Sequence, residues 1–336
     1  MENETTQPSE NSNQENIDLP SKTTKNYQIK FHGSYLQYLG IALYNLLLTV
    51  ITLGIYYPWA KCAIRQFLWQ ETELDNSRFE WHGTGKEMFR GFIKAYLIFG
   101  SLIFLINFGP LFIPPKVFIW VVLICYLAII ALIPIAIHGM MRYRLSRTSL
   151  KGIRFGYRGN LKEFYKQTSL DLLFTIISFG IYASWFQVNM RKFLMKNSKY
   201  GNVSAKFDAT GGDLFLLSIV QGFLVLITFY IYLPWAIIKF YNFYIDNTQI
   251  VKNGTSYRLK SKAKGGQYFI VLIKAFLLTI LTLGIAGPIA ELMIHKYMIE
   301  SIWISGKFNF EDIHQTEEAY TDATGDDMMD ILDIDF

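Results

Sequence analysis

Two long runs without a charged side chain restrict the fold of this sequence more than any other feature. One run extends from Ala95 to Pro115, and the other covers the 21 residues from Val117 to Ile137. A helix of about 20 apolar residues crosses a hydrocarbon core of about 30 Å. The runs therefore predict membrane-spanning helices. With 51% apolar and only 18% charged residues, the composition excludes a disordered chain, a disulfide scaffold and most soluble enzymes.

A basic residue followed by an apolar one recurs along the chain and indicates an internal repeat. The pairs are Lys30-Phe31, Arg78-Phe79, Arg154-Phe155, Lys206-Phe207, Arg258-Leu259 and Lys307-Phe308. Apolar residues at every second position around these pairs favour short strands, and a glycine that permits a sharp turn follows most of them. We predict five tandem strand–glycine–helix–break–helix units. They cover about residues 30–77, 78–153, 154–205, 206–257 and 258–310.

The break inside each unit combines glycine, proline and aromatic residues. Its repeat-motif positions, predicted to be structural, are Gly54, Pro58, Trp59, Gly180, Trp185, Pro234, Trp235, Gly284 and Pro288. In the longer second unit the break extends from Gly109 to Pro115. Tryptophan and tyrosine at these breaks are typical of an aromatic belt at a membrane interface, which serves stability rather than chemistry.

Basic residues gather in the loops that carry the predicted strands. Six lie in residues 61–94, eight in 142–166, five in 191–206 and seven in 239–274. Short loops rich in Lys and Arg remain cytoplasmic, so we expect every strand on that side and each unit to enter the membrane and return. The expected fold is a mainly α, polytopic membrane protein with short cytoplasmic β-strands and both termini in the cytoplasm. Six single-pass helices that violate the charge rule are the alternative.

The two ends of the chain differ from its core. Residues 1–27 are polar, and we expect them to be disordered because they contain too few apolar side chains to offset chain entropy. Residues 31–310 hold 29 basic and twelve acidic residues, whereas residues 311–336 hold ten acidic residues and no basic one. This acidic tail is interpreted as a docking segment for a protein partner, as a solvated end, or as an intramolecular shield over the basic clusters.

Five polar positions in predicted helices are candidates for a function. Arg65, Arg142 and Arg191 can form a ring of cations around a central anionic ligand, or can simply contact phospholipid headgroups. Glu291 and His295 lie four residues apart. They are interpreted either as a proton- or ion-linked pair or as an ordinary pair on one helix face.

Motifs for catalysis, cofactors and metals are absent from the sequence. The five histidines, Cys62 and Cys125 show no metal-ligand spacing, and the segment from Gly83 to Lys86 lacks the Walker spacing. We predict no enzyme activity, no cofactor, no metal and no nucleic-acid partner. The expected partners are the phospholipid bilayer with its anionic headgroups, a second copy of the chain, or a protein bound through the acidic tail.

Three motifs stand out along the chain: Phe31-His32-Gly33, the segment from Leu53 to Ala60, and the segment from Arg78 to Gly83. Together they resemble the YjgN family of bacterial inner-membrane proteins. The resemblance covers about residues 28–310 and departs from the pattern at Ala183-Ser184, where proline is usual. It implies a multi-pass protein of the bacterial inner membrane and no established reaction. Passage or transport of a small solute is one functional hypothesis. A structural or adaptor protein that binds lipid or partners through its basic face and acidic tail is the other.

Overall fold

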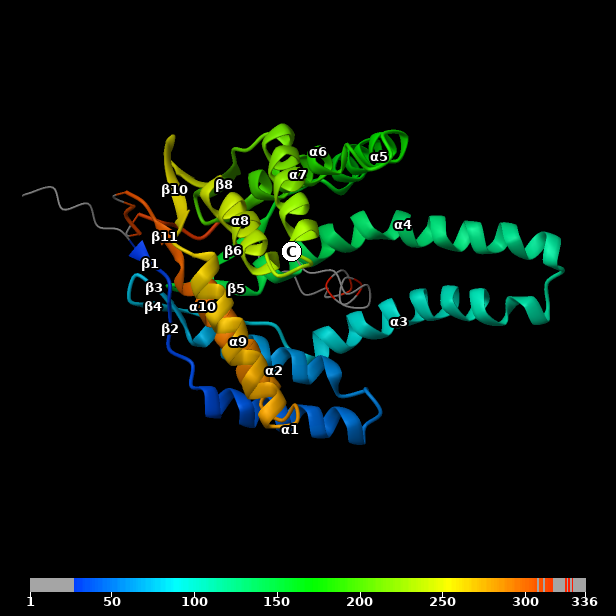
Figure 1. Ribbon diagram of the computed structural model, residues 1–336, viewed down its shortest axis with the longest axis horizontal. Helices are drawn as coiled ribbons and strands as arrows, with labels where there is room; N and C mark the ends of the chain where they lie inside the picture. The colour runs from blue at the N-terminus through cyan, green and yellow to red at the C-terminus, as the bar shows by residue number, and fades with distance from the viewer. Residues whose placement is uncertain are drawn as a thin grey trace, which may run out of the picture.

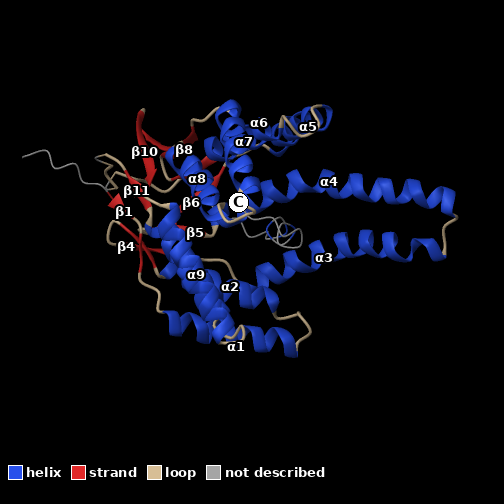
Figure 2. Ribbon diagram, viewed as in Figure 1, coloured by secondary structure: helices blue, strands red, loops and turns tan. Residues whose placement is uncertain are grey.

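The computed structural model describes residues 27–306, 308–310 and 312–316, together with Thr324, Asp326 and Met328. A sheet lies at one end of the molecule, and pairs of helices extend from it (Figures 1 and 2). The helices are α1 (Tyr35–Ile51), α2 (Tyr57–Gln70), α3 (Gly85–Phe108), η1 (Gly109–Leu111), α4 (Pro115–Ser146), α5 (Leu161–Ile177), α6 (Ala183–Asn197), α7 (Gly211–Ile227), α8 (Leu233–Asp246), α9 (Gly265–Leu281) and α10 (Gly287–Glu300). The strands are β1 (Tyr27–Gln28), β2 (Lys30–Phe31), β3 (Thr72–Leu74), β4 (Ser77–Trp81), β5 (Thr148–Leu150), β6 (Ile153–Tyr157), β7 (Ser198–Tyr200), β8 (Val203–Phe207), β9 (Thr248–Lys252), β10 (Thr255–Ser261) and β11 (Ile302–Ile304).

All the described strands belong to one antiparallel sheet that nearly closes on itself. Its order is β1-β11-β10-β9-β8-β7-β6-β5-β4-β3-β2, and the strands at its two ends are separated in sequence only by Ile29. Tight hairpins join most neighbours. Asp75 and Asn76 between β3 and β4 both have positive φ, as do Asn253 and Gly254 between β9 and β10. Two consecutive left-handed residues match the right-handed twist of the paired strands.

Apolar side chains from around the sheet meet in its interior. Leu74, Leu150, Tyr200 and Ile304 are buried there. The chain that follows β11 enters the same cluster, which also contains Phe308, Phe310 and Ile313. Residues that follow β11 therefore contribute to the interior of the sheet.

The described helices form five pairs, and each helix contacts the next along the chain. Helix α1 also contacts α10, which closes the series into a ring. Tryptophans at the starts of α2, α6 and α8 join neighbouring pairs, because each indole lies against the first glycine of the next odd-numbered helix. These contacts are Trp59 with Gly85, Trp185 with Gly211, and Trp235 with Gly265.

Four of the breaks share one backbone geometry. In the first, Leu53 and Gly54 have φ values of 50° and 89°, and the Gly54 N–H donates to the Thr49 carbonyl over 2.7 Å. This bond closes a Schellman-type helix end. The Thr52 hydroxyl accepts from the Tyr56 N–H at 3.0 Å and so begins the next helix. The same left-handed positions recur at Phe179-Gly180, Phe229-Tyr230 and Leu283-Gly284.

Two segments in the described part of the chain are long and apolar enough to span a membrane: Gly85–Leu111 and Pro115–Ser146. Only 17% and 11% of their most apolar windows are buried within the protein, so neither resembles the core helix of a soluble domain. The apolar helices α1, α7 and α9 have 17 residues each. At about 1.5 Å per residue, such a helix is about 25 Å long.

The predicted mainly α, polytopic fold is wrong. The strands build an eleven-stranded sheet rather than a small addition beneath a helix bundle, and two helices among the described residues qualify as candidate spans. The prediction failed because apolar helices dominate the sequence pattern, so the strands were expected to be only a small addition to them. It also missed the first strand of each hairpin, such as β3 and β7, which begins almost as soon as a helix ends. The predicted tails fall largely outside the described residues.

Replacing Gly211 with alanine tests the tryptophan–glycine contacts. A Cβ at Gly211 would lie 2.8 Å from Trp185 Cα and closer still to the indole ring. We expect Gly211→Ala to destabilise the protein by about 1–3 kcal/mol because the neighbouring helices must separate. Gly222→Ala in the same helix is the matched control. It has no neighbour within 4 Å, and alanine there favours the helix by about 1 kcal/mol. The melting temperature of each variant is measured in detergent micelles. An equal fall in melting temperature for both variants would contradict the packing described.

Candidate functional site: a cationic cavity

A polar cavity of about 750 Å³ lies between helices α1, α2, α4 and α10. Apolar side chains form part of its wall, as expected for a small-molecule site. Its polar lining consists of Asn45, Thr49, Lys61, Arg65, Arg144, Glu291 and His295. The cavity therefore collects charged groups from helices that are far apart in sequence.

Helix geometry places the three cations together. Lys61 and Arg65 are four residues apart on α2, so they lie on one face of that helix. Arg144 comes from the last turn of α4. The preceding residue, Tyr143, is fully buried against Trp81 and Cys62, which fixes the end of α4.

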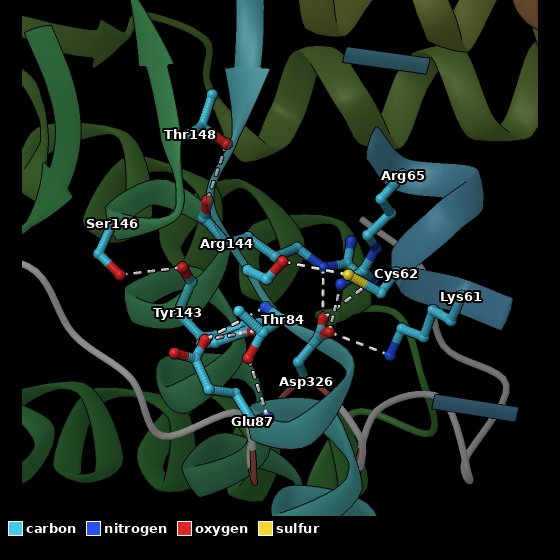
Figure 3. A network of polar contacts seen from close by, with 11 residues as sticks. Lys61, Cys62, Arg65, Thr84, Glu87, Tyr143, Arg144, Ser146, Thr148 and Asp326 are labelled. Atoms are coloured by element: carbon cyan, nitrogen blue, oxygen red, sulfur yellow. Dashed lines mark hydrogen bonds and ion pairs between the residues drawn. The ribbon is translucent and has the colours of Figure 1, made fainter. Parts of the chain in front are cut away.

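The three cations converge on the carboxylate of Asp326 (Figure 3). Lys61 Nζ lies 3.0 Å from Oδ2, and Arg144 Nε lies 2.5 Å from Oδ1. Arg65 donates to both oxygens, through Nη1 to Oδ2 and through Nη2 to Oδ1 at 3.2 Å. Such two-pronged pairs between arginine and a carboxylate are among the strongest charged hydrogen bonds.

This carboxylate is removed from solvent. Asp326 has 0% of its side chain exposed, while Lys61 and Arg65 retain 9% and 12%. Burial by itself raises the pKa of Asp326, but the positive charges of Arg65, Lys61 and Arg144 outweigh it and hold the pKa far below its usual value. Asp326 is therefore ionised at neutral pH. Its ion pairs contribute their full stability above the ordinary aspartate pKa, and this stability is lost progressively as the pH falls toward the lowered pKa.

A second cluster of polar side chains lies beside the cations that hold Asp326. Arg147 donates to Glu87 at 2.9 Å, and the Tyr143 hydroxyl lies 3.4 Å from the same carboxylate. Glu87 also completes a capping box with Thr84 at the start of α3. The contacts tie α3 to the end of α4 next to Arg144.

The structure brings three of the five predicted polar positions into this cavity. Arg65, Glu291 and His295 line it, as does Pro288 of the last break. The His295 ring meets Phe31 edge-on at 5.6 Å, and its buried Nε2 has no hydrogen-bond partner among the described residues. Glu291 and His295 thus face a common space, whereas their predicted proton- or ion-linked role stays a prediction.

Arg142 and Arg191 lie elsewhere. Arg142 is exposed on α4, and Arg191 lies over the rings of Phe207 and Tyr244 at 5.7 and 4.9 Å. Neither belongs to the residues that line the cavity. The three predicted arginines are therefore not gathered around one point.

Sequence reasoning missed Lys61, Arg144 and Asp326. The position of Lys61 four residues before Arg65 was an available signal, whereas nothing near Asp326 in the sequence indicates its partners. Within the described residues, no group of three His, Cys, Asp or Glu side chains comes together to hold a metal ion. The donor set of two guanidinium groups and one ammonium suits an anion.

The protein combines a nearly closed sheet, two exposed helices long enough to span a membrane and a cationic cavity, and no solved structure matches it. A family model described as a bacterial protein of unknown function (DUF898) matches residues 26–221 and 223–331. The chain belongs to this family.

Curated relatives support the resemblance to the YjgN family. The inner membrane protein YjgN of Salmonella typhimurium is 32% identical over 145 residues, which cover 43% of this chain and 35% of the relative. Its namesake from Escherichia coli K12 is 29% identical over 164 residues, 49% of this chain and 38% of the relative. The aligned residues thus span little more than a third of each relative. The names indicate an uncharacterised protein of the inner membrane.

Replacing Asp326 with asparagine tests the ion cluster. The change leaves buried cations without their shared carboxylate, and losing one partner of a buried ion pair costs about 3–5 kcal/mol. We therefore expect residues near position 326 to leave their site. Met328, which is 3% exposed, serves as the reporter when replaced by cysteine in a chain carrying Cys62→Ser and Cys125→Ala. Maleimide labelling of Met328→Cys should accelerate at least about tenfold in Asp326→Asn.

The matched control for this measurement is Asp312→Asn. Asp312 also lies in the acidic tail, but 73% of its side chain is exposed and its contact with Lys252 is 3.9 Å long. Its replacement should leave labelling of Met328→Cys unchanged. Equal rates in both variants would mean that the ion cluster does not hold Met328 in place.

Proposed function

We propose that this chain is an inner-membrane protein that binds a small anion in the cationic cavity and passes it toward the interior of the sheet. One observation supports the proposal above all others. Three cations from two helices converge beside a cavity of about 750 Å³. Polar groups buried between helices at this density are typical of solute sites in membrane proteins.

A series of cavities supports passage. A second cavity, of about 290 Å³, shares Trp69, Arg144 and His295 with the first. A third, of about 240 Å³ inside the sheet, shares Leu145 and Phe155 with the second. Neighbouring cavities thus share lining side chains, and in this proposal rotation of these side chains joins the three spaces.

Exposed tips support a bilayer around the shorter helix pairs. The left-handed residues at the breaks are bulky and almost fully exposed, with values of 93% for Leu53, 97% for Phe179, 87% for Phe229 and 93% for Leu283. A large apolar side chain with positive φ costs about 1–2 kcal/mol in backbone energy. Contact of these tips with lipid would offset that cost. In this proposal α3 and α4 cross the membrane, and the tips of the shorter pairs contact lipid.

Orientation follows from the charge of the loops. All described strands belong to one sheet, so they share one side of any membrane that α3 and α4 cross. The basic clusters flank these strands, and short loops rich in Lys and Arg stay cytoplasmic. The sheet and both ends of the chain are therefore assigned to the cytoplasm in this proposal.

An adaptor that binds anionic lipid or a protein is the second candidate. It is favoured by exposed cations on alternate strands, namely Lys30, Arg78 and Lys206, whose side chains are 53–57% exposed. Asp326 and Met328 are buried, so these two residues of the acidic tail are not presented to a partner in this conformation. Binding to anionic vesicles without solute flux would favour the adaptor.

Single cysteines test the orientation. In inverted and right-side-out vesicles, a membrane-impermeant maleimide should reach Asn76→Cys and Asn253→Cys from the cytoplasmic side only. It should reach Phe112→Cys, at the end of the longest pair, from the opposite side. Leu53→Cys and Leu283→Cys should react from neither side because lipid surrounds them. Labelling of Asn76→Cys and Asn253→Cys from opposite sides would exclude this arrangement.

Narrowing the path tests passage. Phe155 lines both the second and third cavities, so Phe155→Trp adds volume where they meet. We expect at least about a fivefold loss of small-anion flux in proteoliposomes, equivalent to about 1 kcal/mol. Phe179→Trp, at a tip away from the cavities, is the control and should retain the original flux. Anion flux that is absent from the unmodified protein would reject passage altogether.

A further inference from the structure

The contacts of Asp326 show a complete recognition site for a carboxylate. Each of its oxygens faces two donors. Oδ1 receives Arg144 Nε and Arg65 Nη2, while Oδ2 receives Lys61 Nζ and Arg65 Nη1. Figure 3 shows the three side chains directed toward this one group from two helices.

We propose that Lys61, Arg65 and Arg144 form a binding site for small carboxylate solutes, which Asp326 occupies as an internal competitor. This inference rests on the proposed function, because it names the class of anion that enters the cavity. The same three cations that hold Asp326 also line the 750 Å³ space, whereas Asp326 does not. A solute in the cavity therefore meets the donors that now hold the aspartate.

The geometry favours a carboxylate over other anions. The Arg65 guanidinium spans both oxygens of one planar group, which is the bidentate arrangement that arginine forms with carboxylates. The two remaining cations each approach a different oxygen. A spherical halide offers no second atom for the Arg65 fork, and a phosphate would leave further oxygens without a donor in this set.

The position of Asp326 in the chain allows a solute to take its place. It follows β11 in the chain and belongs to neither the sheet nor the five helix pairs, and its contacts with Arg65 join positions 261 residues apart. Nearby Met328 packs into the cluster that contains Phe99, Phe164 and Met190. A tethered group acts at an effective concentration of about the millimolar range. External carboxylates must therefore exceed that level, or the tethered group must leave, before they bind tightly.

Binding measurements on purified full-length protein test the proposal. Titration calorimetry in detergent would compare succinate, acetate, phosphate and chloride. We expect Asp326→Asn to bind succinate at least tenfold more tightly than the unmodified protein, because the competitor no longer carries a charge. Asp312→Asn, the exposed control in the same tail, should bind as the unmodified protein does. Adding Arg65→Gln to Asp326→Asn should abolish the gain.

A second measurement tests the proposal if Asp326→Asn does not fold. If that variant unfolds, millimolar acetate should restore its melting temperature, and Asp326→Glu, which keeps the carboxylate, should fold without acetate. Failure of carboxylates to restore or bind Asp326→Asn would overturn the proposal. Phosphate or chloride binding as tightly as succinate would overturn the assignment to carboxylates.

The outcomes separate this inference from solute passage. Tight succinate binding by Asp326→Asn without flux in proteoliposomes would retain the carboxylate site and reject passage. Equal flux by the unmodified protein and Asp326→Asn, with no difference in binding, would retain passage and reject the role of Asp326.

Discussion

Closure of the sheet is the constraint on which the other elements depend. The short segment that contains β1 and β2 pairs with β11 on one side and β3 on the other. An open sheet would leave edge groups unpaired, and such edges promote association between chains. Because every helix pair leaves one hairpin and returns to the next, closure of the sheet also brings α10 beside α1. The cavity between these helices exists only because the first and last units meet.

The ion cluster around Asp326 lies beside the cavity that closure of the sheet creates. Burying three cations next to one another is costly unless an anion accompanies them. Asp326 supplies that anion to Lys61, Arg65 and Arg144. The contacts of Asp326 therefore link the ring of helices to the acidic tail. A carboxylate solute that replaced Asp326 would change the position of this tail.

Much of the strand pattern could be predicted from the sequence because it is local. Five of the six basic–apolar pairs fall in β2, β4, β6, β8 and β10, and the sixth includes Lys307, which lies outside the described residues. Their partner strands follow helices directly and have three to five residues. Such strands are defined by pairing rather than by their own periodicity. The length and apolar character of α3 and α4 could likewise be predicted, whereas apolar composition alone could not separate helices of spanning length from shorter ones.

The long-range contacts of the candidate site could not be predicted from local sequence patterns. Arg65, Glu291 and His295 could be selected because polar side chains within apolar helices are unusual. Arg142 was selected in place of Arg144. Residues two positions apart on a helix are rotated by about 200° about its axis, so these two arginines face opposite sides of α4. Which side faces inward depends on the neighbours of α4, which the sequence does not state. A shield over the basic clusters was one of three interpretations of the acidic tail, but only the folded ring determines that Asp326 meets Lys61, Arg65 and Arg144 at one buried point.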